Sequence, residues 1–123
     1  MINETVLRNL IPLALLFVVC DLPWLYMNLP HAQAMIKNIQ GGMPIQMRWA
    51  GTPPVYLALA FLVQQAPSTL DAFFIGLSTY AVYDFTNYST LAKYDLSFAV
   101  ADSIWGGVLF SIVREAAKRL NLM

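Results

Sequence analysis

Hydrophobic positions along the chain fall into four long runs separated by shorter polar stretches. The runs cover about residues 6–27, 50–66, 70–88 and 96–113. An α-helix needs roughly 20 mostly apolar residues to cross a bilayer. The second run is the shortest, and it carries Pro53 and Pro54 where the first turn of a helix tolerates proline. The pattern therefore predicts four transmembrane helices.

The links between the later runs are short. QQAPST joins the second run to the third, with Pro67 as a stop and Ser68 or Thr69 as the N-cap of the next helix. STLAKYD joins the third run to the fourth. Short links place antiparallel helices side by side. We therefore expect one domain over residues 1–123, an all-α membrane four-helix bundle with up-down-up-down topology.

The first link, residues 28–48, is much longer than the others. Its segment HAQAMIKNIQ has apolar residues at helical spacing, followed by a glycine pair: Ala32, Met35, Ile36, Ile39 and then Gly41–Gly42. This pattern predicts a short helix within the first loop. Two placements fit it, one at the membrane interface and one as an ordinary loop helix packed on the bundle.

Composition supports a membrane location. The 123 residues are 59% hydrophobic and 11% charged, whereas soluble domains average about 25% charged residues. The net charge is +0 without a basic tract, so we expect no nucleic-acid partner. The run from Leu10 to Met27 lacks a small-residue cleavage site, which favours a retained helix over a signal peptide. The expected partners are the lipid bilayer and other copies of the chain.

The distribution of Lys and Arg predicts the orientation. The side that carries both termini has the larger number of cations, Arg8, Arg114, Lys118 and Arg119, against Lys37, Arg48 and Lys93 on the other side. Cytoplasmic segments are enriched in Lys and Arg. A multi-pass integral membrane protein with cytoplasmic termini is therefore expected.

Three aspartates lie inside predicted spans, whereas no Lys or Arg does: Asp21, Asp84 and Asp102. An ionised side chain near the bilayer centre costs about 2.5–3.5 kcal/mol on insertion scales. Counted at a rise of 1.5 Å per residue, all three lie roughly 6–10 Å below the surface that carries the first link. We therefore expect three carboxylates in one leaflet, on three different helices, facing the interior of the bundle.

Polar and aromatic side chains accompany these aspartates. Tyr80 and Asn87 share the helical face of Asp84. The spacing D-x-x-W occurs twice, in DLPW and DSIW. An indole N–H reaches a carboxylate across helices, so each tryptophan is expected to serve a neighbouring helix. The candidate proton or cation site comprises Asp21, Asp84, Asp102, Asn87 and Thr86, lined by Trp24, Tyr80, Tyr83 and Trp105; for the aromatic residues, an interfacial belt is the alternative.

This set of residues restricts the chemistry. Clustered carboxylates repel one another, so they share a proton or bind a cation, and their oxygens suit Ca²⁺ or Mg²⁺. Arg48, at the mouth of the second span, is a candidate counter-charge. His31 in the first link is either a surface residue or a proton collector. One Cys and one His cannot build a zinc site, and no nucleotide-binding glycine motif is present. We expect no resident cofactor or metal, although a bound cation or lipid fits the site.

The residues of the third and fourth runs carry a resemblance. The pattern Y-x-x-Y-D-x-T-N followed by D-x-x-W-G is met at Tyr80, Tyr83, Asp84, Thr86 and Asn87, then Asp102, Trp105 and Gly106. It resembles an uncharacterised family, a domain of unknown function, of small four-helix membrane proteins found in bacteria and in large DNA viruses of algae. The first span matches as Asp21, Trp24 and Leu25, with Asp-Leu-Pro-Trp departing slightly from the shorter bacterial spacing. The resemblance implies a fold and a membrane location, but no activity.

Three functions fit these observations. The leading hypothesis is a small membrane protein whose carboxylates bind or conduct a proton or cation. The second is a protein that binds or modifies a lipid or another amphipathic small molecule. The third is an oligomeric structural membrane protein, including one of a viral membrane. The sequence does not decide whether the chain is an enzyme.

Overall fold

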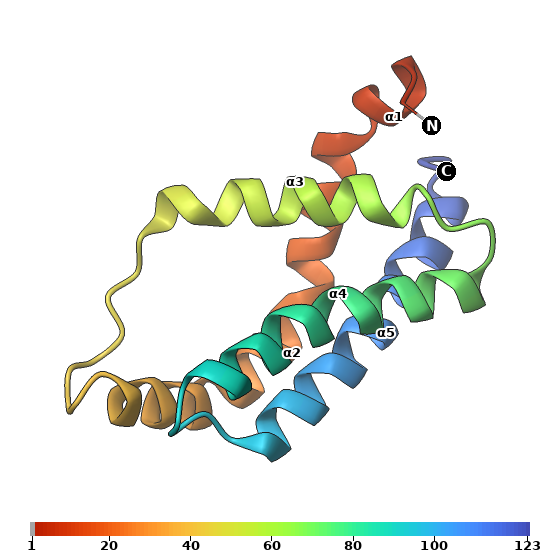
Figure 1. The fold of residues 1–123 in the computed structure, drawn as a ribbon. Coiled ribbons are helices and arrows are strands. Elements are labelled where there is room, and N and C mark those ends of the chain that lie inside the picture. Colours follow the sequence, from red (N-terminus) through yellow and green to blue (C-terminus); the bar gives the residue numbers. More distant parts are fainter. Residues whose placement is uncertain (1) are drawn as a thin grey trace.

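The computed structural model describes residues 2–123, which fold into helices joined by loops (Figure 1). In chain order they are α1 (Glu4–Arg8), α2 (Leu10–Ile39), the short 3₁₀-helix η1 (Trp49–Gly51), α3 (Thr52–Val63), α4 (Thr69–Thr90) and α5 (Leu96–Arg119). The prediction of an all-α protein is confirmed. The third and fourth hydrophobic runs correspond to α4 and α5, each of which extends beyond its run.

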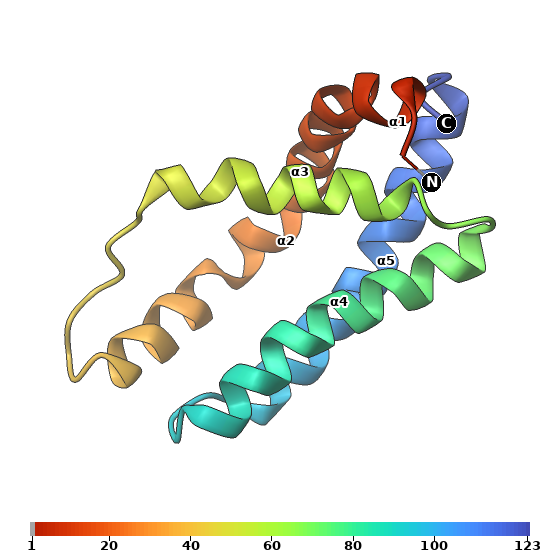
Figure 2. The ribbon, with the colours of Figure 1, turned by 45° about the horizontal axis from the view of Figure 1, so that its top comes forward.

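Two helices, α2 and α5, are long and apolar enough to cross a membrane. The segment Trp49–Val63, which joins η1 to α3, is a shorter apolar helix. The predicted up-down four-helix bundle is not confirmed. Instead, α3 lies across the first half of α2, whereas α4 and α5 run antiparallel and side by side (Figures 1 and 2).

Glycines bring the backbones of α4 and α5 into contact. A Cβ atom on Gly106 would lie 2.7 Å from the carbonyl oxygen of Gly76, and one on Gly107 would lie 2.7 Å from the ring of Phe73. Real side chains do not tolerate such distances, so only glycine fits at these positions. Small residues at helix interfaces allow this close approach in membrane proteins. This pair of helices positions Asp84 against the start of α5.

The first half of α2 has one buried and one exposed face. Leu13 and Phe17 are fully buried against α3 and α5. The opposite face carries large exposed apolar side chains at helical spacing: Ile11, Leu15, Val19 and Leu22. A soluble monomer rarely exposes a continuous apolar surface of this kind. This face is therefore suited to lipid.

α2 does not end at the first predicted span but continues to Ile39 through Pro23 and Pro30. Proline removes one backbone hydrogen bond and bends a helix without necessarily ending it. Figures 1 and 2 show the bend between the two halves of α2. The expectation of a separate helix in the first loop is therefore wrong, because that segment continues the first span. The glycine pair follows as expected, with φ of 65° at Gly41 and 99° at Gly42.

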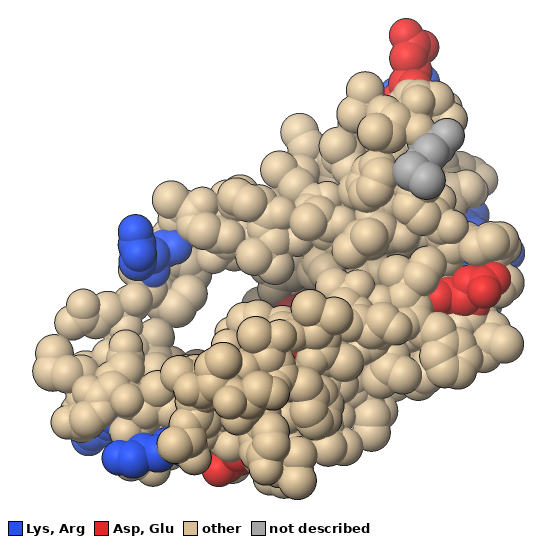
Figure 3. Space-filling model, in the orientation of Figure 1, with Lys and Arg blue, Asp and Glu red and all other residues tan. Residues whose placement is uncertain are grey.

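The two ends of the chain lie together. The side-chain amide of Asn9 donates a hydrogen bond to the carbonyl oxygen of Leu122 at 2.9 Å. At the same end, Ser68 caps α4 by accepting a hydrogen bond from the backbone of Asp71, as one of the two sequence alternatives predicts. Most charged side chains on the visible face lie toward the periphery of the molecule, and its middle is largely uncharged apart from a small acidic area (Figure 3).

Candidate functional site

The carboxylate of Asp21 joins three helices. Its side chain is 4% exposed on α2. One oxygen accepts a hydrogen bond from the hydroxyl of Tyr56 on α3 at 2.7 Å. The other accepts the indole N–H of Trp105 on α5 at 2.8 Å. Two neutral donors therefore satisfy a carboxylate that has little contact with solvent.

Asp102 on α5 is hydrogen-bonded to α2. It accepts the indole N–H of Trp24 on α2 at 3.0 Å. The rings of Trp24 and Trp105 stack with their centroids 5.3 Å apart and their planes 6° apart. Each tryptophan thus donates a hydrogen bond to an aspartate on the neighbouring helix. The repeated D-x-x-W spacing produces a reciprocal pair of bonds between α2 and α5.

Asp84 is the most enclosed of the three aspartates. Its side chain is 0% exposed, and its Oδ1 accepts the hydroxyl of Tyr94 at 2.7 Å. Its Oδ2 is buried without a hydrogen-bonding partner. The carboxyl groups of Asp84 and Asp102 are near enough to act on each other electrostatically, and so are those of Asp21 and Asp102. We call Asp21, Asp84 and Asp102 the aspartate cluster.

The aspartate cluster forms no ion pair with Lys or Arg within residues 2–123. Within residues 2–123, no Lys or Arg nitrogen lies within 4.0 Å of an Asp or Glu carboxylate. Arg48, the candidate counter-charge, is exposed just before η1 and forms no such pair. In the same part of the chain, no three His, Cys, Asp or Glu side chains are placed to hold one metal ion. The side-chain hydrogen bonds that the cluster accepts come from tyrosine hydroxyl and tryptophan indole groups.

The remaining candidates divide into two groups. The ring of Tyr80 packs on Gly106 beside the aspartate cluster, and Asn87 is half-buried near the Tyr94 hydroxyl. Tyr83, however, is 63% exposed, and Thr86 is exposed as well. Both side chains face outward on α4, so their membership of the site stays a prediction that their exposure does not support.

Two tyrosines of the site escaped the sequence analysis. Tyr56 is the only hydroxyl residue of the apolar helix α3 after its first residue, Thr52, and Tyr94 lies in the link between α4 and α5. A lone hydroxyl in a buried apolar helix is a usable signal, because it needs a partner there. Tyr94 offers no such signal, because only the turn before α5 brings it back to Asp84. Burial raises the pKa of the Tyr94 phenol, and its hydrogen bond to Asp84 raises it further.

The second half of α2 covers the Tyr94 turn. Met35, 5% exposed, packs against Tyr94 and Ala99. His31 places its Nε2 2.8 Å from Oδ2 of Asp95, and its ring stacks on Phe98 with centroids 5.6 Å apart. This contact favours the packed placement of the predicted loop segment over the interfacial one. It also puts the only histidine beside the turn that reaches Asp84.

An opening passes through the molecule between α3 and the second half of α2, where the link of residues 40–48 closes it (Figure 3). A small area of acidic surface is visible at its edge. A shallow hollow of about 330 Å³ lies on the second half of α2 and the following link, lined by Gln33, Ala34, Lys37, Pro44 and Ile45. None of the three aspartates lines that hollow.

Comparison with known proteins gives one match. No curated protein and no solved structure matches the chain. Residues 6–117 match the family model described as "Predicted membrane protein (DUF2177)". The match runs from the end of α1 to residue 117 in the last turn of α5 and includes the whole aspartate cluster. The chain therefore belongs to this family of predicted membrane proteins, whose function is unknown.

Proposed function

We propose that the aspartate cluster binds a proton within the membrane and exchanges it with one side. The observation that carries this proposal is the buried Oδ2 of Asp84, which lacks a partner next to the carboxyl group of Asp102. Two adjacent carboxylates without a cation repel strongly in a medium of low dielectric constant. One shared proton removes this repulsion and supplies the missing hydrogen bond.

A proton is a better occupant than a metal ion. Ca²⁺ takes six to eight oxygen ligands, and Mg²⁺ requires near-octahedral coordination. The oxygens of Asp21 already accept bonds from Tyr56 and Trp105, and no group of three acidic side chains surrounds one point in residues 2–123. A proton needs only the two facing carboxyl groups, Asp84 and Asp102.

Access to this proton differs between the two ends of the molecule. Toward the termini, fully buried apolar side chains fill the space beside the aspartate cluster: Leu13, Phe17, Leu109, Phe110 and Val113. A hydrophobic constriction of this kind excludes water and blocks proton transfer. Toward the other end lie the polar Tyr94 turn and the His31–Asp95 contact. We therefore propose exchange from that side, with complete transfer requiring rearrangement of the apolar layer.

The proton-binding proposal is tested with Asp84→Asn and Asp102→Asn. Infrared difference spectra of the reconstituted protein should show a protonated carboxyl band that both variants lose. Proton flux into proteoliposomes containing a pH-sensitive dye should fall to the level of empty vesicles in the same variants. The matched control is Asp71→Asn, an exposed aspartate on the same helix as Asp84. A wild-type protein with neither the band nor the flux contradicts the proposal.

The opening in Figure 3 favours a second candidate function, the binding of a lipid or another amphipathic molecule beside the aspartates. The stacked Trp24 and Trp105 would supply an apolar wall, and the Asp102 carboxyl group a polar contact. Mass spectrometry of the purified protein distinguishes the two functions. A stoichiometric co-purified lipid that is lost in Trp24→Ala supports this candidate, and a lipid-free protein that retains the carboxyl band excludes it.

A further inference from the structure

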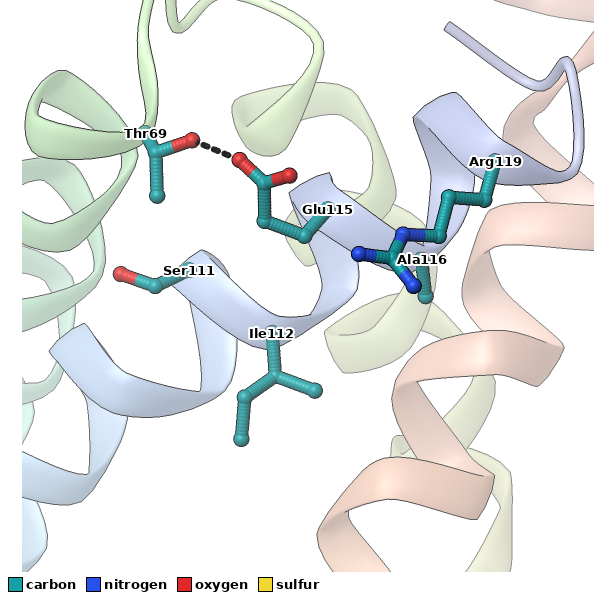
Figure 4. Close-up of a pocket in the computed structure, with 6 residues that line it drawn as sticks. All are labelled: Thr69, Ser111, Ile112, Glu115, Ala116 and Arg119. Atoms are coloured by element: carbon teal, nitrogen blue, oxygen red, sulfur yellow. Dashed lines mark hydrogen bonds between the residues drawn. The ribbon is translucent and has the colours of Figure 1, made fainter.

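A second surface hollow lies at the opposite end of the α4–α5 pair from the Tyr94 turn. Figure 4 shows its lining, which comes from the start of α4 and the end of α5: Thr69, Ser111, Ile112, Glu115, Ala116 and Arg119. The hollow has a volume of about 420 Å³. Thr69 is 15 residues before Asp84 on α4, which places it about 22 Å along the helix at 1.5 Å per residue. The hollow is thus separate from the aspartate cluster.

The hollow carries one negative and one positive side chain that do not pair. The carboxylate of Glu115 accepts a hydrogen bond from the hydroxyl of Thr69 (Figure 4). The same hydroxyl accepts one from Arg114. Glu115 is exposed near the end of α5. Arg119 follows one helical turn later and has no carboxylate within 4.0 Å in residues 2–123. Two opposite charges therefore remain available to a ligand.

The floor of the hollow is apolar. Ile112 and Ala116 line it, and Ile112 is 45% exposed on the outward face of α5. Ile104, two turns earlier on the same helix, is 50% exposed and continues this apolar surface toward the middle of the membrane. The charged pair is at the end of the spanning helix, at the level where lipid headgroups lie. The surface is thus charged at the end of α5 and apolar toward its middle, and a lipid likewise has a charged headgroup followed by apolar acyl chains.

We propose that this hollow binds a phospholipid whose headgroup carries a primary ammonium, with the phosphate on Arg119, the ammonium on Glu115 and an acyl chain along Ile112. Guanidinium groups bind phosphate through two parallel hydrogen bonds. A primary ammonium donates three hydrogen bonds to acceptors such as Glu115, whereas a quaternary ammonium donates none. An anionic headgroup without an ammonium would leave Glu115 unpaired and repelled by the phosphate.

Native mass spectrometry of the full chain in detergent tests this site. Three probes are added in turn: phosphatidylethanolamine, phosphatidylcholine and phosphatidylglycerol. The wild type should bind the ethanolamine lipid about tenfold more tightly than the other two, because one charge-assisted hydrogen bond corresponds to about one decade in affinity. Arg119→Gln should weaken all three lipids, whereas Glu115→Gln should abolish only the preference for ethanolamine.

Lys118→Gln is the matched control, because Lys118 is an exposed neighbouring cation that does not line the hollow. It should bind the three lipids as the wild type does, and all variants should keep the thermal stability of the wild type, because the altered side chains are exposed. Equal binding of the three lipids by the wild type overturns the proposal. So does a change of oligomeric mass in Arg119→Gln without a change in lipid binding, which would assign the hollow to a second copy of the chain.

Discussion

Trp24 and Trp105 stack face to face, and each donates its indole N–H to the aspartate that lies one helical turn before the other. The two D-x-x-W motifs therefore form a reciprocal contact between α2 and α5. An aspartate in lipid is expensive unless it is hydrogen-bonded. The contact satisfies Asp21 and Asp102 without a cation, which leaves the carboxyl groups free of any salt bridge.

Trp105→Phe should destabilise the protein by about 1–3 kcal/mol, because the buried carboxylate of Asp21 loses one of its two donors. The apolar ring and its stacking on Trp24 are largely kept, so the loss reports the hydrogen bond. Thermal unfolding in detergent measures the difference. Trp49→Phe is the control, because Trp49 is 70% exposed. Equal unfolding temperatures for the two variants would show that the indole bond contributes nothing.

Gly106→Ala should separate α4 from α5. Its new methyl group would lie 2.7 Å from the backbone oxygen of Gly76, which cannot move away without shifting α4. Overpacking of this kind costs about 1–3 kcal/mol or more. Gly51→Ala is the matched control, because a methyl group there meets no atom within 4 Å. Circular dichroism during heating should show a lower transition for the first variant only; matching transitions would contradict the observed packing of the two helices.

Much of this arrangement can be predicted from the sequence. Hydrophobic length predicts the positions of the long helices α2, α4 and α5, and counting residues along them predicts that Asp21, Asp84 and Asp102 lie in one neighbourhood. The outward turn of Tyr83 and Thr86 was missed, because aromatic and polar residues near the end of a span fit a site and a membrane surface equally well. Which face is buried depends on partners far away in the chain.

The path of the first link, residues 28–48, could not be predicted from the sequence either. Pro23 and Pro30 fit either a helix end or a bend, and only packing decides between the two. Met35 is buried against Tyr94 and Ala99, and this contact favours continuation of the helix to Ile39. Likewise, α3 lies across α2 because Tyr56 reaches Asp21 there. A count of apolar residues carries no such information.

Tyr94→Phe should remove the hydroxyl that donates to Oδ1 of Asp84 and lower stability by about 1–3 kcal/mol at neutral pH. The difference between wild type and variant should depend on pH. Because the pKa of Tyr94 is raised on folding, the folded chain holds this proton more tightly than the unfolded chain. The contribution is therefore complete below pH about 10, the ordinary pKa of tyrosine, and decreases as the pH rises above it.

Chemical denaturation of both proteins at pH 8 and at pH 11 measures this change. Taking the difference between wild type and variant cancels the titration of the other tyrosines. Tyr83→Phe serves as the control on the same helix as Asp84, because Tyr83 is 63% exposed. It should alter stability at neither pH. A wild-type advantage over Tyr94→Phe that grows at alkaline pH would refute the assigned hydrogen bond.

Met35→Ala should release the second half of α2 from the Tyr94 turn. Met35 is 5% exposed, and its loss removes the main apolar contact between this segment and the start of α5. Truncation of a buried methionine costs at least about 2 kcal/mol, which corresponds to roughly 30-fold faster local opening. Hydrogen–deuterium exchange of the amides in residues 31–39 measures it. His31→Ala should have a smaller effect, because an exposed pair such as His31–Asp95 contributes about 0.2–1 kcal/mol.

The same exchange experiment separates local release from general unfolding. Amides in the second half of α5 pack in the apolar core around Phe110, away from Met35, and should exchange at the wild-type rate. Met27→Ala is the control within α2, because Met27 is 76% exposed. If Met35→Ala speeds exchange equally in residues 31–39 and 109–117, the second half of α2 is part of the same cooperative unit as the core. It would then be unable to move independently above Asp84, and access to the aspartate cluster from that side would require unfolding of the whole protein.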